Sequence, residues 1–380
     1  MRKYFPFIRD FVRHADMYLF SLCCICTMFG MVIISSATAS YGNSYRFILV
    51  QMIAFLIGIC LYVVFTLLDV DIIADYWMYL FLFSIGFILI LIPLGVEGDT
   101  GNKAWLRFAG IGIQPTEVVK IIFIVLMAKH ITYLKEYRDL NAPLSVLQLV
   151  LHFGILVGLI FVVTRDMGSA LIFFAIFAVQ LFMAGLKLYW FAFGIAGIAA
   201  VFPFFWTHIL TDHYRERILA PYDPSIDPQN TGINWQANQS KIALASGQLT
   251  GTGLGNGTQT QSSALSQKHT DFIFAAAGEE LGMIACVLII ALLMLIVLRC
   301  VQVGLRSNNT MSCLICFGMA AFMAFQVFIN IGMCIGLMPV IGLTLPFFSY
   351  GGSSLFSTFA AMGIVSGIKY RPTPKRFYSL

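Results

Sequence analysis

Residues 271–299 read DFIFAAAGEELGMIACVLIIALLMLIVLR, an almost unbroken apolar run bounded by Asp271 and Arg299. A helix rises about 1.5 Å per residue, so a run of this length crosses a hydrocarbon core of about 30 Å. Runs of about 20 apolar residues recur along almost the whole chain. Backbone groups in lipid must be hydrogen-bonded within the protein, and the runs are too long and too uniformly apolar for barrel strands. We therefore expect membrane-spanning helices.

The composition supports the same class. The chain has 380 residues, of which 59% are hydrophobic and 11% charged, whereas a soluble protein carries about 25% charged residues. The formal net charge of +5 does not indicate nucleic-acid binding, because the basic residues are scattered through short loops and tails. The sequence predicts an all-α polytopic membrane protein with no nucleic-acid partner.

We predict ten spans in a membrane domain over 17–370, between tails at 1–16 and 371–380. The spans are predicted at 17–39, 46–68, 75–95, 114–132, 145–163, 168–186, 188–210, 272–298, 311–337 and 346–369. Lys and Arg gather in the first tail, after the fourth, sixth and eighth spans, and in the last tail. The positive-inside rule then predicts a multi-pass protein with both termini in the cytoplasm.

Two segments are predicted to lie outside the cell. One is 96–113, and the other is a large polar loop at about 211–271 between the seventh and eighth spans. A loop of this length is unlike a mere connection between helices. It has too few apolar residues for a core of its own, so we expect it to serve a site on the membrane domain.

A charged residue inside a span costs about 2.5–3.5 kcal/mol and is by default a functional candidate. In QPTEVVK (114–120), Pro115 suits the first turn of a helix, and Glu117 and Lys120 are three residues apart and share a face. One reading is a buried structural ion pair. The other is a pair that opens to a cavity from outside, and the two readings can coexist.

Further polar residues are predicted to face the same compartment. Asp166 joins the fifth and sixth spans, either as a helix N-cap or as a carboxylate of the site. Asp271 begins the eighth span, where an acid favours the helix dipole by about 0.3–1 kcal/mol. That effect explains an acid there, but it leaves unexplained why His269 and Asp271 lie on the same side as Lys120 and Trp105.

Two more groups carry alternative readings. Glu279 and Glu280 lie about 12 Å deeper than Asp271 along the helix, and we favour a structural or cavity-lining role for them. Arg215 and Arg217 either clamp phosphate oxygens or flank the membrane interface. The six histidines and nine cysteines show no metal-ligand spacing, so we predict no protein-built metal centre.

These ionisable groups converge near the outer surface, whereas a secondary transporter centres its site at the midplane, often between repeats. An outer-leaflet site suits a lipid-linked substrate with an activated pyrophosphate. Attack by a sugar hydroxyl then needs a base near the acceptor and cations near the departing pyrophosphate.

Four segments in this order resemble the SEDS family of RodA, FtsW and SpoVE, and the resemblance covers nearly the whole chain. They are QPTEVVK (114–120), DPSIDPQNTGINWQANQSKIALASG (223–247), HTDFIFAAAGEELG (269–282) and GLMPVIGLTLPFFSYGGSSL (336–355). GTQTQ (257–261) leans towards the RodA branch, while GLGNG (253–257) also resembles FtsW and SpoVE.

The resemblance implies a peptidoglycan glycosyltransferase that polymerises lipid II at the outer face of the bacterial cytoplasmic membrane, with a class B penicillin-binding protein as crosslinking partner. It places the family's essential aspartate at Asp271, its paired fourth-span residues at Glu117 and Lys120, and its outer-loop tryptophan at Trp105. The remaining substrate-binding residues that we carry over are Asp166, Arg215, Arg217, His269, Gln239 and Ser240.

The mechanistic hypothesis is a single inverting displacement in which Asp271 is the general base for the acceptor sugar's 4-hydroxyl. Lys120, with an arginine or a divalent cation (Mg²⁺ or Mn²⁺), offsets the pyrophosphate charge; alternatively, Lys120 pairs with Asp271 and tunes it. The sequence departs from the family at LSQK (265–268), where LPE-x is usual, and at GINWQ (232–236). These departures affect the turn before Asp271 and the loop contacts.

Two other functions fit the same residues. A flippase would bind the lipid II head group through its carboxylates and Lys120 during transit. A non-catalytic scaffold would recruit a cell-wall synthase.

Overall fold

The computed structural model describes residues 9, 11–42, 44–96, 103–108, 111–223, 225–229 and 231–371. These residues are mainly helical, with one small antiparallel hairpin of β1 (Leu106–Phe108) and β2 (Ile111–Ile113). The predicted all-α polytopic membrane fold is confirmed. Most of the predicted tails at 1–16 and 371–380, and part of the outer segment 96–113, lie outside the described residues.

Each predicted span overlaps a helix. These helices are α2 (Met17–Ala37), α3 (Ser44–Leu67), α5 (Trp77–Leu89) with α6 (Leu91–Leu94), α7 (Pro115–Tyr137), α8 (Pro143–Thr164), α9 (Met167–Ala184), α10 (Leu188–Phe204) with the π-helix η1 (Phe205–Ile209), α14 (Ile273–Leu305), α15 (Thr310–Cys334) and α16 (Gly352–Tyr370). Within the described residues, eight of them are long and apolar enough to cross a membrane; α7 and α16 are outside this set. The count of ten spans therefore stays a prediction.

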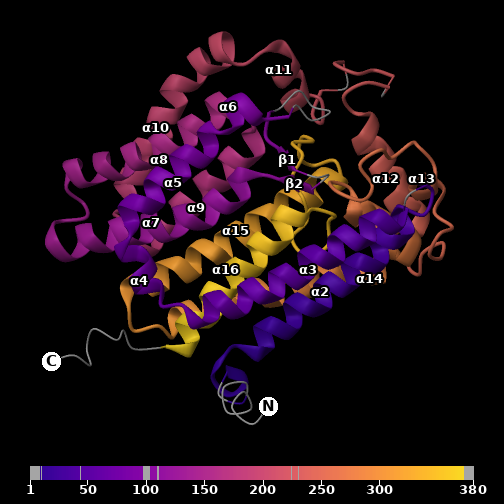
Figure 1. The fold of residues 1–380 in the computed structure, drawn as a ribbon. Coiled ribbons are helices and arrows are strands. Elements are labelled where there is room, and N and C mark those ends of the chain that lie inside the picture. Colours follow the sequence, from indigo (N-terminus) through magenta and orange to yellow (C-terminus); the bar gives the residue numbers. More distant parts are fainter. Residues whose placement is uncertain are drawn as a thin grey trace.

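Four short helices connect these elements: α4 (Val70–Asp75), α11 (Asp212–Leu219), α12 (Trp235–Gly247) and α13 (Thr258–Gln261). The last three belong to the predicted outer loop, and α12 packs against α14. Figure 1 shows the start of α2 and the end of α16 at one end of the molecule and the hairpin with α11, α12 and α13 towards the other. The loop thus folds onto the membrane helices.

The start of the predicted tenth span is wrong. We expected it at 346, but α16 begins at Gly352, and the preceding segment 335–351 is not helical and is mostly buried only from Leu343 onwards. Gln51 satisfies part of its backbone, donating to Ser349 O at 3.2 Å and accepting from Gly351 N at 3.2 Å. Irregular backbone is tolerated at membrane depth where the protein itself buries it.

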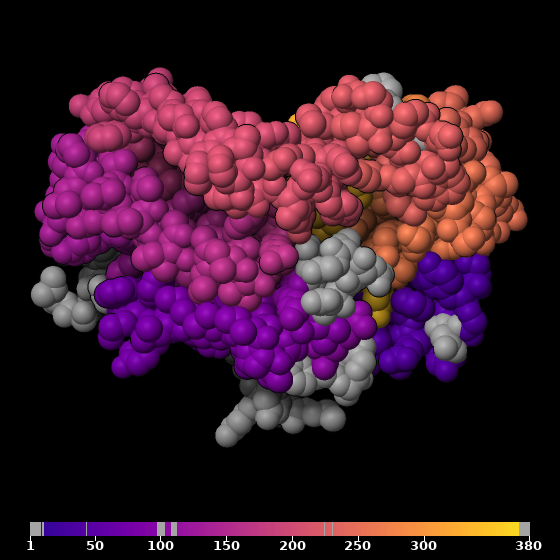
Figure 2. All heavy atoms as spheres, turned by 90° about the horizontal axis from the view of Figure 1, so that it is seen from above, coloured from indigo at the N-terminus to yellow at the C-terminus, as the bar shows by residue number. Residues whose placement is uncertain are grey.

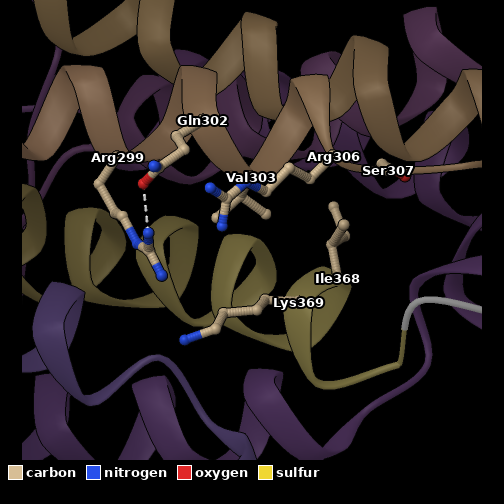
Figure 3. A pocket seen from close by; sticks show the side chains of 7 residues that line it. All are labelled: Arg299, Gln302, Val303, Arg306, Ser307, Ile368 and Lys369. Carbon is tan, nitrogen blue, oxygen red and sulfur yellow. Dashed lines mark hydrogen bonds between the residues drawn. The ribbon is translucent and has the colours of Figure 1, made fainter.

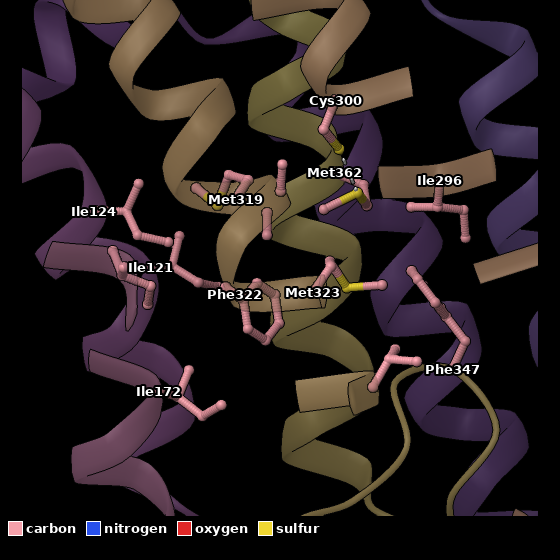
Figure 4. Packing of buried hydrophobic residues seen from close by; sticks show 14 of the residues in the cluster. Ile121, Ile124, Ile172, Ile296, Cys300, Met319, Phe322, Met323, Phe347 and Met362 are labelled. Carbon is pink, nitrogen blue, oxygen red and sulfur yellow. Dashed lines mark hydrogen bonds between the residues drawn. The ribbon is translucent and has the colours of Figure 1, made fainter. Parts of the chain in front are cut away.

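Helix α15 lies in the interior of the bundle. Its side chains Met319, Phe322 and Met323 are buried, and Figure 4 shows them between Ile124 of α7 and Met362 of α16. Most of the residues of α15 are buried, so any polar side chain it carries needs a partner inside the protein. Two such side chains turn out to organise the site.

Candidate functional site

The turn before α14 is held by the segment 335–351. Within the turn, Phe272 N donates to Gln267 O at 3.1 Å. From the segment, Tyr350 N donates to His269 O at 2.8 Å, and Ser349 Oγ donates to Thr270 O at 2.6 Å. Backbone atoms of two consecutive turn residues are therefore fixed from outside the turn.

Asp271 is held by its main chain and leaves its carboxylate available. Its carbonyl accepts from Asn330 Nδ2 at 2.8 Å and from Cys334 Sγ at 3.7 Å. Among the described residues, its carboxylate makes no hydrogen bond or ion pair. Gly342, with φ of +70°, lies opposite, and a Cβ there would be 3.6 Å from Asp271 Oδ2. The arrangement leaves room beside a fixed carboxylate.

Burial and, secondarily, the negative charge of Asp166 raise the pKa of Asp271 to about 6, against the opposing charge of Arg217. A group with this pKa is largely ionised near neutral pH and still binds a proton in the transition state, which suits a general base. Asp166, Arg217 and Asp271 thus form one electrostatic group.

Asp166 serves as the N-cap of α9 and also belongs to this group. Its Oδ1 accepts from Ser169 N at 3.0 Å, and its Oδ2 accepts from Ser169 Oγ at 2.6 Å and Gln114 Nε2 at 3.2 Å. Burial raises its pKa, while the hydrogen bonds from Ser169 lower it. Of the two readings of Asp166 from the sequence, the helix N-cap is confirmed; Asp166 also acts electrostatically on Asp271, and its role as a carboxylate of the site stays a prediction.

Lys120 and Glu117 form the buried ion pair that was one of the two readings. Lys120, which is 1% exposed, donates to Glu117 Oε1 and to Gln326 Oε1, each at 3.0 Å. Its ammonium lies 4.5 Å from the ring centroid of Phe322. The pair is closed to the outside here, and Lys120 is not paired with Asp271. Glu117 raises the pKa of Asp166 and Lys120 lowers it, so the two members of the pair act on Asp166 in opposite directions.

Two amides that the sequence analysis missed connect these groups. Gln326 Nε2 donates to Thr344 O at 2.9 Å, and Asn330 Nδ2 donates to Leu343 O at 2.6 Å. Both lie on α15, four residues apart and on one face, and both hold the segment 335–351. A signal was present, because polar side chains one turn apart inside an apolar span call for an explanation.

The two arginines of the outer loop have different partners. Arg215 donates to Asp212 Oδ1 at 2.9 Å and to Thr207 O at 2.8 Å, which ties α11 to η1. Arg217 makes no hydrogen bond or ion pair among the described residues, and its charge acts on Asp271. Figure 2 looks down on this end of the molecule, where the chain after α10 crosses above gold-coloured C-terminal residues. Only Arg217 of the pair is free to meet an anion.

The other predicted contacts lie at the same end of the molecule but are engaged in packing. Trp105 bridges to Val96, and its ring lies against Gly112 of the hairpin. Ser240 Oγ donates to Cys334 O at 2.7 Å, which fixes α12 to the end of α15. Gln239, next to it, is buried. The structure brings none of these three side chains into contact with Asp271.

His269 lies in an aromatic cluster. Its ring is 5.7 Å from that of Tyr41, 5.1 Å from that of Phe47 and 5.6 Å from that of Tyr350, measured between centroids. Burial, and then Lys268, lower its pKa to about 4, so it is neutral near pH 7. Its buried Nδ1 has no hydrogen-bond partner within the described part of the chain.

Lys268 is a second anchor for the turn, at the position that the LPE-x pattern leaves unspecified. Lys268 is buried and donates to Ser40 Oγ at 2.8 Å, to Ser262 O at 3.1 Å and to Thr260 O. It also lies 4.9 Å from the ring centroid of Tyr41. The turn that lacks the usual Pro and Glu is thus held by a lysine.

The chain matches the family model described as cell cycle protein, covering FtsW, RodA and SpoVE, over residues 16–373. The chain belongs to this family. It is 32% identical to the probable peptidoglycan glycosyltransferase FtsW of Geobacter metallireducens, over 95% of this chain and 96% of that protein. It is 34% identical to the peptidoglycan glycosyltransferase MrdB of Escherichia coli K12, over 74% of this chain and 75% of that protein.

Solved structures support the family's fold for this chain. One is a chain from a study of how a peptidoglycan synthase complex coordinates polymerization and crosslinking. It has a TM-score of 0.76 and 26% identity, and it covers 94% of this chain and 98% of that chain. The rod shape-determining protein RodA of Thermus thermophilus has a TM-score of 0.67 at 24% identity, covering 93% and 96%.

Proposed function

We propose that this protein is a peptidoglycan glycosyltransferase, which polymerises lipid II into glycan strands at the outer face of the bacterial cytoplasmic membrane. The observation that carries the proposal is the Asp271 carboxylate, which is fixed through its main chain and has a pKa raised to about 6. It has no hydrogen-bond or ion-pair partner among the described residues. Family membership and the names of the curated relatives support the same activity. Both termini then lie in the cytoplasm.

In the proposed reaction, the 4-hydroxyl oxygen of the acceptor sugar bonds to C1 of the donor sugar. Asp271 takes the hydroxyl proton, and the bond between C1 and the pyrophosphate oxygen breaks. The lipid pyrophosphate leaves with the bonding electrons, and inversion at C1 gives a β-linked strand from an α-linked donor. Arg217 makes no hydrogen bond or ion pair among the described residues and its charge acts on Asp271, so we assign it to the departing pyrophosphate.

Lys120 and Glu117 act as positioning residues in this proposal. Glu117 raises the pKa of Asp166 and Lys120 lowers it, so the pair acts on Asp166 in opposing directions, and the charge of Asp166 raises the pKa of Asp271. The hydrogen bond from Lys120 to Gln326 also links α7 to the segment that clamps the Asp271 turn. Contact of Lys120 itself with the pyrophosphate would require this buried pair to open.

The sugars and peptide of lipid II would contact the polar residues around the Asp271 turn. We propose Trp105, His269, Gln239 and Ser240 for these contacts, since all four lie in or beside outer segments. Arg215 is committed to the junction of η1 and α11, so we give it an anchoring role.

A divalent cation is compatible with this site. Mg²⁺ commonly binds one or two carboxylates together with substrate phosphates, and Asp166 and Asp271 are coupled carboxylates. These two residues would hold Mg²⁺ or Mn²⁺, which would neutralise pyrophosphate charge. If so, chelation with EDTA lowers polymerisation and either metal restores it.

We also propose a class B penicillin-binding protein as partner, because glycan strands must be crosslinked after polymerisation. The similar chain in a solved peptidoglycan synthase complex supports this assignment.

The test is polymerisation of lipid II in detergent by the purified protein, alone and with its transpeptidase. Polymer from the wild type and none from Asp271→Asn supports the enzyme. Translocation of labelled lipid II in liposomes without polymer would instead identify a flippase. Absence of both activities with intact partner binding would identify a scaffold, and either result overturns the proposal.

A further inference from the structure

A basic pocket lies between α14 and α16, at the opposite end of the molecule from Asp271. Its volume is about 170 Å³, and its polar lining consists of Arg299, Gln302, Arg306, Ser307 and Lys369. Helix α14 is kinked at Gly282, and the helix after the kink continues through an apolar run that ends at Arg299. Arg299 lies beside Lys369 in the last turn of α16, so the pocket lies at the other membrane surface, the cytoplasmic one in the proposed orientation.

Two helices direct cations into this pocket. Arg299, Gln302 and Arg306 are three and four residues apart along α14 and therefore share one face. Lys369 comes from the last turn of α16. Figure 3 shows the side chains of Arg299, Arg306 and Lys369 reaching into the space between the two helices.

One carboxylate is available for three cations. Asp16, which is fully buried, accepts from Arg299 Nε at 2.7 Å and lies 3.4 Å from Lys369 Nζ. Arg306 makes no ion pair within the described residues. The three lining cations and this one carboxylate leave a net charge of +2 (3 − 1) around the pocket. Basic residues commonly flank membrane helices and favour helix C-termini, but that tendency does not require them to converge on an open space.

The pocket has the size and the donors for a phosphate group. At about 30 Å³ per water, 170 Å³ holds about five or six waters, which is enough for a tetrahedral anion of five heavy atoms. Arginine binds phosphate oxygens through two parallel hydrogen bonds. The Ser307 hydroxyl and the Gln302 amide add neutral donors at the rim.

We propose that this pocket binds the phosphate of an anionic phospholipid headgroup from the adjoining leaflet. Basic pockets between membrane helices on the cytoplasmic side bind such headgroups in general. The position at the membrane surface places a headgroup in the pocket while its acyl chains stay in the bilayer. The same chemistry would accept a phosphate from solution, and the experiment separates the two sources.

The experiment measures binding to the purified full-length protein in detergent by native mass spectrometry. The probes are dioctanoyl-phosphatidylglycerol, dioctanoyl-phosphatidylcholine and glycerol 3-phosphate. We expect the phosphatidylglycerol to bind at least about tenfold more tightly than the zwitterionic lipid, because hydrogen bonds to charged groups contribute that much. Arg306→Gln should lose about tenfold, and Arg306→Lys should retain part of the affinity.

The matched control is Arg138→Gln, which removes one exposed charge at the end of α7, on the same predicted side and outside the pocket. It should bind phosphatidylglycerol like the wild type, and melting temperatures verify that each variant is folded. Unchanged binding by Arg306→Gln, or an equal loss in Arg138→Gln, overturns the proposal. Glycerol 3-phosphate binding as tightly as the lipid, with the same dependence on Arg306, overturns the lipid assignment and makes the pocket a soluble-phosphate site.

Discussion

Asp271 lies in the turn before α14 and Glu279 lies eight positions later within that helix, yet their carboxylates are in opposite situations. Glu279 accepts hydrogen bonds from the backbone N–H groups of Gln259 and Thr260 at 2.9 and 2.7 Å, and from hydroxyl groups of the same loop. Its neighbour Glu280 accepts from Gln261 Nε2 at 2.7 Å and from Ser36 Oγ. The carboxylate of Asp271 has no such donor among the described residues.

The difference separates two uses of a buried acid. A carboxylate whose oxygens already accept several hydrogen bonds stabilises the fold, because its lone pairs are already used. Here Glu279 anchors the glycine-rich loop at 251–261. Gly251 and Gly282 let the backbone of this loop approach the backbone of α14. Both glycines have positive φ, and a Cβ on either would overlap the opposing segment. A carboxylate that is held by its main chain and left without donors is available to a substrate. This contrast decides which acid we assign to chemistry.

The largest expected effect is on activity at Asp271. Asp271→Asn keeps the shape and removes the base, so polymerisation of lipid II should fall by about 10²–10⁴-fold. The melting temperature should stay close to the wild-type value, because no side-chain hydrogen bond is lost. The control is Glu216→Gln, an exposed acid on α11, which should polymerise normally. Substantial polymer from Asp271→Asn would contradict the assignment of Asp271 to chemistry and of Glu279 to structure.

The reverse pattern is expected at Glu279. Glu279→Gln places an amide N–H₂ where the loop presents backbone donors, so about 1–3 kcal/mol of stability should be lost for each unsatisfied group. Thermal unfolding in detergent measures the loss, and activity per folded molecule should remain near the wild-type level. If Glu279→Gln is stable but inactive, this acid takes part in the chemistry and the distinction fails.

Much of the fold could be predicted, because the helices follow from apolar length. The exception is the segment 335–351, whose apolar residues imitate the start of a span. Its irregular backbone is satisfied by Gln51 and Asn330, which are distant in sequence. Phe347, with φ of +66°, marks a conformation that side-chain composition does not reveal. Apolarity therefore predicts burial more reliably than it predicts helix at this segment.

Candidate residues for the site could be named from the sequence, but their partners could not. The expected places of Asp166, Glu117 and Lys120, near the predicted outer ends of their helices, followed from the helix boundaries. That Lys120 pairs with Gln326 depends on packing between α7 and α15, which no local pattern encodes. The same limit applies to Arg215 and Arg217, since two residues of one type on a short helix face different surroundings.

A smaller effect is expected at Arg217. Arg217→Gln removes the free cation beside Asp271 and should reduce kcat/KM for lipid II by about tenfold, the equivalent of about 1.4 kcal/mol. Lys241→Gln removes an exposed charge from α12 and serves as the control, with no expected change. A loss of the same size in both variants would indicate a general effect of positive charge on lipid binding. It would contradict the assignment of Arg217 to the pyrophosphate.

The smallest effect is a shift in the pH dependence of the reaction. Asp271 must be ionised to accept a proton, so activity should fall as the pH drops through its pKa of about 6. The charge of Asp166 raises that pKa, and removing the charge should therefore lower it. Asp166→Asn does this while keeping an effective N-cap. The acid limb of its pH–activity profile, where activity falls as the pH drops, should therefore move to lower pH. Asp212→Asn, which removes an acid paired with Arg215, should leave the limb in place. A limb that stays fixed in Asp166→Asn would mean that burial alone tunes Asp271, and a limb that moves to higher pH would contradict the coupling of the two carboxylates.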